Sequence, residues 1–290
     1  MNNKNKAILC ILISAFSFSL MSLCVRLAGD LPAIQKAFFR NLVAAGMAFV
    51  LLKRSGSGFS FKKENLPWLL MRAIFGTIGV FANFYAISHM VLSDASMLNK
   101  LSPFFVLIFS YLFLKEKLSP FQGAAIVIAF IGSMMIIKPT FNFTEIFPAA
   151  CGFVGGLTAG AAYTCVRYLG IRGERGPFIV FFFSVFSCLA ALPYMVLFYE
   201  PMQPLQLLAL LGAGLGAAGG QFGITAAYKY APAKEISIYD YSMIIFAAIW
   251  SALFFGELPD RYSVIGYILI FAMSFAMFWY NNHQKAAETS

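Results

Sequence analysis

The sequence is poor in charged residues. Only 11% of its 290 residues are Asp, Glu, Lys or Arg, whereas an ordinary soluble domain carries about 25%. Hydrophobic residues make up 60% of the chain, and a soluble fold of this length could not bury that much apolar surface. We therefore expect an integral membrane protein whose solvent is largely lipid.

Acidic residues are scarcer than basic ones, with 12 Asp and Glu against 21 Lys and Arg and a net charge of +9. A basic chain can bind nucleic acid, but that function needs one basic face. Here the Lys and Arg residues fall mostly in short segments between apolar runs. We exclude nucleic acid as a partner and expect these charges to set the orientation in the bilayer.

The chain also lacks the residue patterns of catalysis, metal binding and nucleotide binding. It has two histidines and neither a His-Glu-x-x-His nor a Gly-x-Ser-x-Gly pattern, so we do not expect an enzyme. Its five cysteines show no Cys-x-x-Cys spacing, which argues against a disulfide framework or a zinc site. Without a Gly-x-x-x-x-Gly-Lys-Ser/Thr loop, ATP-driven transport would need another subunit. We expect no cofactor and no metal.

Long apolar runs are what the chain does contain. A membrane-crossing helix needs about 20 apolar residues. The first such run could be a signal peptide, but nine further runs and Arg26 at its far end favour a retained helix. The sequence thus predicts an all-α membrane protein of ten transmembrane helices at 7–27, 32–52, 66–88, 93–114, 121–138, 146–168, 177–198, 204–228, 234–255 and 263–280.

The Lys and Arg residues between these runs predict the orientation. If the N-terminus is cytoplasmic, only Arg26, Lys138 and Arg261 fall on the opposite side, and the other basic residues outside the helices are cytoplasmic. We therefore expect both termini in the cytoplasm. The absence of visible sorting signals suits a bacterial inner membrane.

One stretch of sequence occurs twice. The Cys-Val-Arg and Gly of residues 24–29 return at 165–170, 141 positions later, and the Ser-x-Leu-Phe-x-x-Glu of residues 110–116 returns at 251–257 with the same offset. A single offset over this distance indicates a duplicated unit. We expect two repeats, 1–140 with helices 1–5 and 141–290 with helices 6–10 and a short polar tail.

An odd number of helices in each repeat inverts the second copy. Arg26 and Glu257 then lie on the outer side, whereas their counterparts Arg167 and Glu116 lie on the inner side. Inverted repeats are typical of secondary transporters, in which substrate sites lie at the interface between the repeats and access alternates between the two sides.

The end of the first repeat carries the most specific motif. Pro103 is followed by Phe-Leu-Lys-Glu at 113–116, and Gly123, Gly132 and Lys138-Pro139 come after it. This run resembles the end of an EamA repeat in the ten-helix branch of the drug/metabolite transporter superfamily. The second copy keeps Glu257 and Gly266 but has Ile244 in place of Pro103.

The resemblance covers nearly the whole chain and implies two inverted five-helix bundles. It also implies that the third, fourth, eighth and ninth helices are among those around a central cavity. It does not specify what is carried.

Glycines recur at spacings of three and four in two of the predicted helices. Such faces let helices approach closely. We expect static packing, with a surface for sliding as the alternative, at Gly152, Gly155, Gly156 and Gly160 and at Gly212, Gly216, Gly219, Gly220 and Gly223.

Two charges inside predicted helices are the sharpest functional signal, since each costs a few kcal/mol in the bilayer centre unless satisfied. Lys100 lies seven residues into the fourth helix, about 10 Å deep, and Asp240 enters the ninth from the opposite side. The repeat aligns Lys100 with Tyr241 and Asn99 with Asp240. These residues could bind a substrate, pair with each other as a gate, or form a structural ion pair.

Further polar residues complete the predicted site. Arg40 could bind a carboxylate or phosphate bidentately, whereas Arg72 is expected to be mostly structural, because it is close enough to the inner surface to snorkel. Amides and aromatic side chains suit a metabolite with polar and apolar parts. The remaining candidates for substrate binding are Asn83, Tyr163, Gln221, Tyr239 and Trp250.

The predicted function is secondary active transport of a small organic metabolite, with the lipid bilayer as the other partner. Deep cations outnumber deep anions, which favours an amino acid or another carboxylate-bearing solute. A nucleoside-like or cationic metabolite or drug, in either direction, remains the alternative, ahead of a channel or an intramembrane enzyme. If a proton drives transport, Asp240 is the first candidate carrier. Both a monomer and a homodimer are compatible with the sequence.

Overall fold

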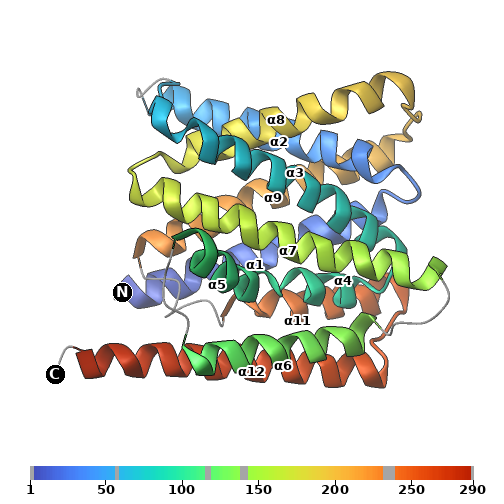
Figure 1. The fold of residues 1–290 in the computed structure, drawn as a ribbon. Coiled ribbons are helices and arrows are strands. Elements are labelled where there is room, and N and C mark those ends of the chain that lie inside the picture. The colour runs from blue at the N-terminus through green and yellow to red at the C-terminus, as the bar shows by residue number, and fades with distance from the viewer. Residues whose placement is uncertain (1–2, 56–58, 115–118, 138–142, 231–238, 289–290) are drawn as a thin grey trace.

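The chain forms a bundle of helices (Figure 1). This computed structural model describes residues 3–55, 59–114, 119–137, 143–230 and 239–288 and contains no β-strand within them. A short 3-10 helix η1 (Lys63–Asn65) precedes α3, and a π-helical turn η2 (Ser251–Phe255) follows α11. The main helices are α1 (Asn3–Leu27), α2 (Ala33–Arg54), α3 (Leu66–His89), α4 (Leu92–Asn99), α5 (Ser102–Leu114), α6 (Pro120–Ile137), α7 (Phe143–Ile171), α8 (Gly176–Leu197), α9 (Pro204–Tyr230), α11 (Ser242–Trp250) and α12 (Arg261–Glu288).

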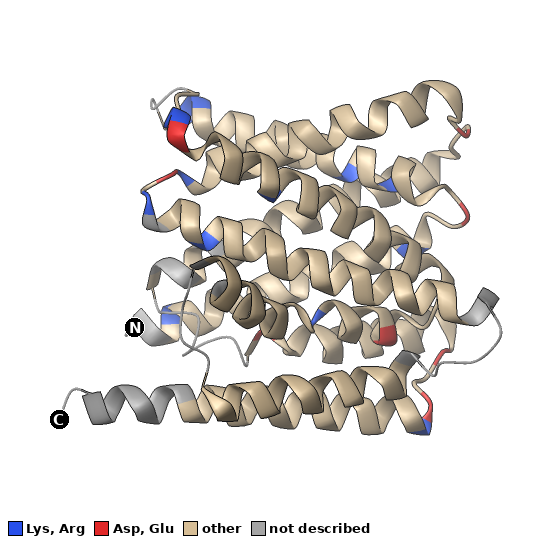
Figure 2. Cartoon of the chain, in the orientation of Figure 1, with Lys and Arg blue, Asp and Glu red and all other residues tan. Residues whose placement is uncertain are grey.

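The helices confirm a multi-pass membrane protein. In the described part of the chain, eight segments are long and apolar enough to cross a membrane, and two apolar helices, Pro120–Ile136 and Ser242–Phe255, are shorter. These segments correspond to the ten predicted runs. Both ends of the chain lie on the same side of the bundle (Figure 1), and most charged residues lie near helix ends (Figure 2). We refer to the two sides as the terminal end and the opposite end.

The most extensive helix contacts join the two halves of the chain. They pair α1 with α9, α3 with α7, α2 with α8 and α6 with α12. The 141-residue offset relates α1 to α7 and α3 to α9, so the α1–α9 contact and the α3–α7 contact are equivalent. It also relates α2 to α8 and α6 to α12, so each of these contacts joins two equivalent helices. A two-fold axis in the membrane plane produces this pattern, as expected for an inverted repeat.

Related polar contacts tie the loops at both ends of the bundle. At the opposite end, the Gln35 side chain donates to the Glu200 carbonyl at 2.8 Å and accepts from the Glu200 N–H at 3.0 Å. At the terminal end, Lys62 Nζ donates to the Arg172 carbonyl at 2.9 Å, and Asn65 Nδ2 donates to Glu174 Oε2 at 2.9 Å. These contacts join α2 to the segment after α8 at one end of the bundle, and the segment before α3 to the α7–α8 loop at the other.

The glycine face of α7 lies against α3, α4 and α5. A Cβ on Gly156 would stand 2.5 Å from the Leu98 carbonyl oxygen, and one on Gly155 would stand 3.2 Å from Asn83 Cβ. A real Cβ cannot approach backbone that closely, so glycine is what brings α7 against the end of α4. The expected close packing is therefore present in α7.

The fourth predicted helix, 93–114, is broken where the sequence suggested a continuous one. Helix α4 ends at Asn99, and α5 begins at Ser102 after a two-residue turn. Pro103 accounts for the break, because it has no N–H for the Asn99 carbonyl and disfavours helical geometry in the residue before it. Proline is tolerated in the first turn of a new helix, which is where it lies in α5.

The ninth predicted helix, 234–255, is interrupted at the matching position. Tyr241, the counterpart of Lys100, is a turn residue, and α11 begins at Ser242 although no proline is present. The prediction of one continuous helix is thus wrong for the described part of each repeat. Residues 234–238 and Glu116 lie outside the described residues.

Gly156→Ala tests the close contact between α7 and α4. Overpacking against backbone should lower the free energy of unfolding by about 1–3 kcal/mol, which thermal unfolding in detergent would detect. Gly170→Ala in the same helix is the matched control, because nothing lies within 4 Å of a Cβ there. Equal melting temperatures for the two variants would contradict the contact.

Candidate functional site

A central cavity of about 90 Å³ lies between the two halves. Its walls come from α3, α4, α9 and α11, as the family resemblance implies, and also from α1, α2, α7 and α8. Six of the ten predicted site residues line it, namely Arg40, Asn83, Asn99, Lys100, Tyr163 and Gln221.

Two buried arginines lie against one aromatic ring at the edge of this cavity. Arg40 is 3% exposed and Arg72 is 4% exposed. Their guanidinium carbons stand 5.9 Å and 4.2 Å from the centre of the Phe183 ring. Among the described residues, the Nε atoms of both have no hydrogen-bond partner, and only Arg40 donates to a side-chain oxygen, on Asn41. Within the described ranges, neither arginine forms an ion pair with an acidic residue.

Gly76 makes room for the Arg72 guanidinium. It lies one turn after Arg72 on α3, and a Cβ there would collide with the guanidinium and come within 2.8 Å of Phe183 Cε2. The side chain therefore turns inward and stacks on α8 instead of snorkelling to the surface. The expectation that Arg72 snorkels to the membrane surface is therefore wrong, because the side chain is buried, whereas its expected structural role stays a prediction. In the sequence, the glycine one turn after an intramembrane arginine could have indicated that the side chain turns inward.

Lys100 is the third cation of the cavity, and it is paired. Its Nζ forms an ion pair with Asp240 Oδ2, and the two side chains are 8% and 14% exposed. The other carboxylate oxygen, Asp240 Oδ1, is buried without a hydrogen-bond partner. The structure thus brings together the two charges that the sequence placed at related depths in opposite repeats.

The same region joins the two helix breaks. The Lys100 carbonyl has lost its helical donor, because Phe104 N–H donates to Leu101 instead. The Tyr241 hydroxyl donates to this free carbonyl at 3.0 Å. One break is therefore completed by a side chain from the other, which satisfies a backbone group that lipid could not.

The remaining two predicted residues lie elsewhere. Tyr239 packs beside Ala7, Ile11 and Ile224 at the contact between α1 and α9. Trp250 donates from Nε1 to Ser19 Oγ at 3.1 Å, which ties α11 to α1. In this conformation both support helix packing and neither is among the residues that line the cavity.

The electrostatics of the cavity favour an anion. Asp240 offsets Lys100, whereas Arg40 and Arg72 have no acidic partner in the described part of the chain. An unsatisfied charge inside a membrane costs a few kcal/mol, and a planar guanidinium matches the two oxygens of a carboxylate or phosphate. No group of three His, Cys, Asp or Glu that could hold a metal occurs among the described residues.

Comparisons with known proteins agree with this architecture. The sequence profile of the EamA-like transporter family matches the chain twice, at residues 5–138 and 146–279. A pseudopaline exporter of Pseudomonas aeruginosa is 32% identical over 93% of this chain and 95% of its own length. Human solute carrier family 35 member G1 is 28% identical over 90% of this chain and 75% of its own length.

Two more distant proteins also match over most of this chain. A riboflavin transporter of Vibrio cholerae is 26% identical over 86% of this chain and 84% of its own length. A solved crystal structure matches with a TM-score of 0.66 and 14% identity, covering 93% of this chain and 95% of the other. This last likeness shows the fold alone.

The Lys100–Asp240 pair can be tested with a double-mutant cycle. Lys100→Met or Asp240→Leu alone should lower the free energy of unfolding by about 3–5 kcal/mol, because each leaves a buried charge unpaired. The double variant should be more stable than either single variant, since it leaves no charge behind. Thermal unfolding in detergent measures all four proteins. Additive losses in the double variant would show that the pair does not act as a unit.

Proposed function

We propose that this chain, which belongs to the EamA-like transporter family, is a secondary active transporter of a small carboxylate-bearing organic solute. The family membership makes it a membrane transporter. The proposal adds the solute class, a cytoplasmic membrane with both termini in the cytoplasm, and alternating access by two inverted halves, 1–140 and 141–290. Enzymatic activity is no part of this function.

The unpaired arginines are the observation that carries the solute class. Arg40 and Arg72 are buried, share the Phe183 ring and have open donor positions at Nε. A carboxylate would satisfy these donors and the charge at once. The aromatic ring would contact the apolar part of the same solute.

Export is the direction that the relatives favour. The pseudopaline exporter matches this chain over nearly the full length of both proteins. We propose export of an organic anion on that basis, without assigning pseudopaline itself as the solute.

Asp240 is the proposed coupling group. Its Oδ1 is free while Oδ2 holds Lys100. Protonation of this carboxylate would release Lys100, which could then bind an anionic solute in the adjoining cavity. A single group would thereby link proton binding to solute binding.

A ring-bearing, nucleoside-like solute is the alternative. Tyr163, Phe18 and Phe183 line the same cavity, and one relative is a riboflavin transporter. A cationic solute fits less well, because it would meet two unpaired arginines.

Ligand-induced thermal stabilisation tests the solute class. Purified protein should be stabilised by amino acids or other carboxylates, by about 2.7 kcal/mol at 100 times the dissociation constant. Arg72→Gln and Arg40→Gln should weaken this binding at least about tenfold, as expected for the loss of a charge-assisted hydrogen bond. Arg54→Gln, an exposed change in the same helix as Arg40, should bind normally.

Counterflow in proteoliposomes separates transport from passive flux. The solute that stabilises the protein should show saturable counterflow, and a channel would show none. Full affinity in both cavity-arginine variants would reject the carboxylate site. Stabilisation only by ring compounds without a carboxylate would support the alternative.

A further inference from the structure

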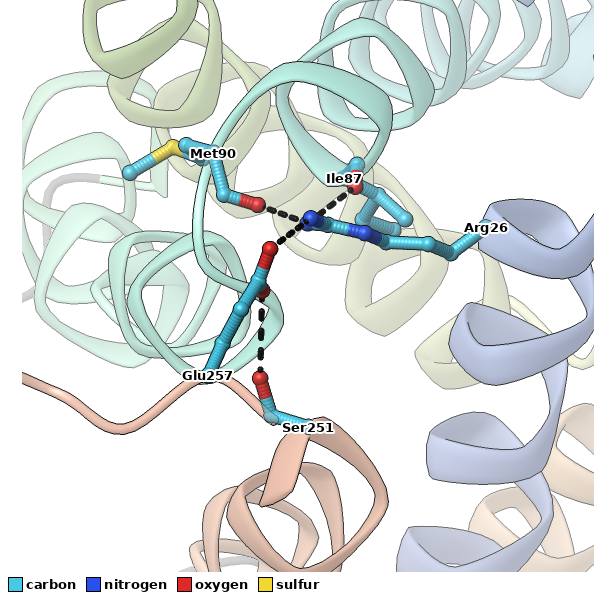
Figure 3. Close-up of polar contacts among 5 residues, drawn as sticks. All are labelled: Arg26, Ile87, Met90, Ser251 and Glu257. Atoms are coloured by element: carbon cyan, nitrogen blue, oxygen red, sulfur yellow. Dashed lines mark hydrogen bonds and ion pairs between the residues drawn. The ribbon is translucent and has the colours of Figure 1, made fainter. Parts of the chain in front are cut away.

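A second charged cluster lies around Arg26 at the end of the bundle opposite the termini (Figure 1), and Figure 3 shows its polar contacts. Arg26, at the end of α1, forms an ion pair with Glu257, which follows η2. The same guanidinium donates to the Ile87 carbonyl at 3.2 Å and to the Met90 carbonyl, both at the end of α3. It also lies 4.9 Å from the centre of the Phe255 ring. One side chain therefore joins three segments of the chain.

The helices that lead into these three segments also line the central cavity. On α1, Met21 lines the cavity, and Arg26 follows five residues later, about 7.5 Å further along the helix. On α3, Phe84 lines the cavity, and Ile87 follows by about one turn in the same direction. Met243 of α11 contributes from the third side. The Arg26 cluster thus lies beyond the cavity, at the ends of helices that line it.

The Glu257 side of the cluster has the means to move. The helix preceding it loosens into the π-helical turn η2 and ends at Gly256, whose φ is +64°. Nothing lies within 4 Å of a Cβ placed on Gly256. The ion pair is also partly exposed, with side-chain exposures of 15% for Arg26 and 31% for Glu257. Because both charges are only partly buried, separating them costs far less than breaking a fully buried pair.

We infer that Arg26 and Glu257 form a gate that closes the solute cavity at the end opposite the termini and opens during each transport cycle. The inference rests on the proposed transport function, because it assigns a moving part to alternating access. In the closed state, the guanidinium holds the end of α1 against α3 and the η2–α12 connection. Breaking the pair lets the η2–α12 connection and the end of α1 separate, which exposes the cavity on that side.

Thiol labelling tests the gate without requiring the solute. The native cysteines are replaced, and Val80→Cys supplies a single thiol on the cavity wall. A membrane-impermeant maleimide is added to right-side-out or inside-out vesicles. Glu257→Gln should raise labelling from the opposite-end face about fivefold, as expected for the loss of one charged hydrogen bond at a partly exposed site. Labelling from the terminal-end face should fall, since one equilibrium governs both.

Two further variants sharpen the test. Arg26→Gln should have the larger effect, because it also removes the bonds to the Ile87 and Met90 carbonyls. Glu200→Gln removes an exposed carboxylate from the same end of the bundle without touching Arg26, and it should label as the parent does.

A rise in labelling from the opposite-end face together with a fall from the terminal-end face distinguishes a gate from a structural contact. A merely structural role for the pair would loosen the protein and raise labelling from both faces, and that result would overturn the inference, as would unchanged labelling in Glu257→Gln. Thermal unfolding of each variant identifies proteins that have lost the fold. The isosteric Glu257→Gln is the variant whose labelling decides between a gate and a structural contact. Because the readout is independent of any solute, a gate can be present even where the proposed carboxylate fails to bind.

Discussion

The hydrogen bond from the Tyr241 hydroxyl to the Lys100 carbonyl is the contact on which the centre of the molecule depends. Lipid offers no partner to a backbone group that a broken helix releases. Each repeat nevertheless breaks a helix at the matching position, and the side chain of one turn satisfies the backbone of the other. The adjoining Lys100–Asp240 ion pair connects the same two turns. The two halves are thus bonded to each other beside the cavity, at the two helix breaks. Irregular backbone is tolerated at this depth only because protein surrounds it.

The three cations around the cavity differ in how their charges are satisfied, and this difference separates their roles. Lys100 has a carboxylate from the other repeat, so its positive charge is balanced without a ligand. Among the described residues, Arg40 and Arg72 have no acidic partner; Arg40 donates to the Asn41 amide, and both guanidinium groups lie against the Phe183 ring. Two like charges in a low-dielectric site raise each other's energy. This cost, together with the space that Gly76 leaves for one guanidinium, supports the proposal that the pair receives the negative charge of a solute.

The sequence predicted the large-scale architecture because that depends on local composition and on one repeat offset. Apolar runs located the crossings, and the Lys100 and Asp240 layers followed from the offset. Pro103 could have revealed the first helix break, whereas nothing comparable marks Tyr241. Arg72 was assigned to the surface from its depth along its own helix. Its true position depends on Gly76 and on Phe183 of another helix, and long-range packing of that kind cannot be inferred from one segment. Solute binding by the cavity residues stays a prediction.

The size of the cavity connects solute binding to movement. A space of about 90 Å³ is smaller than the 300–1,000 Å³ of most small-molecule sites. A solute larger than this space would bind only where the surrounding helices stand further apart. Such a solute must bind a conformation with a wider cavity more tightly than it binds the present one. A ligand shifts the equilibrium between two conformations only through such a difference in affinity. If Arg40 and Arg72 bind the solute as proposed, the energy gained there is available to separate the helix ends that Arg26 holds together. Empty protein has no such gain, so the unpaired arginines favour opening only when solute is present.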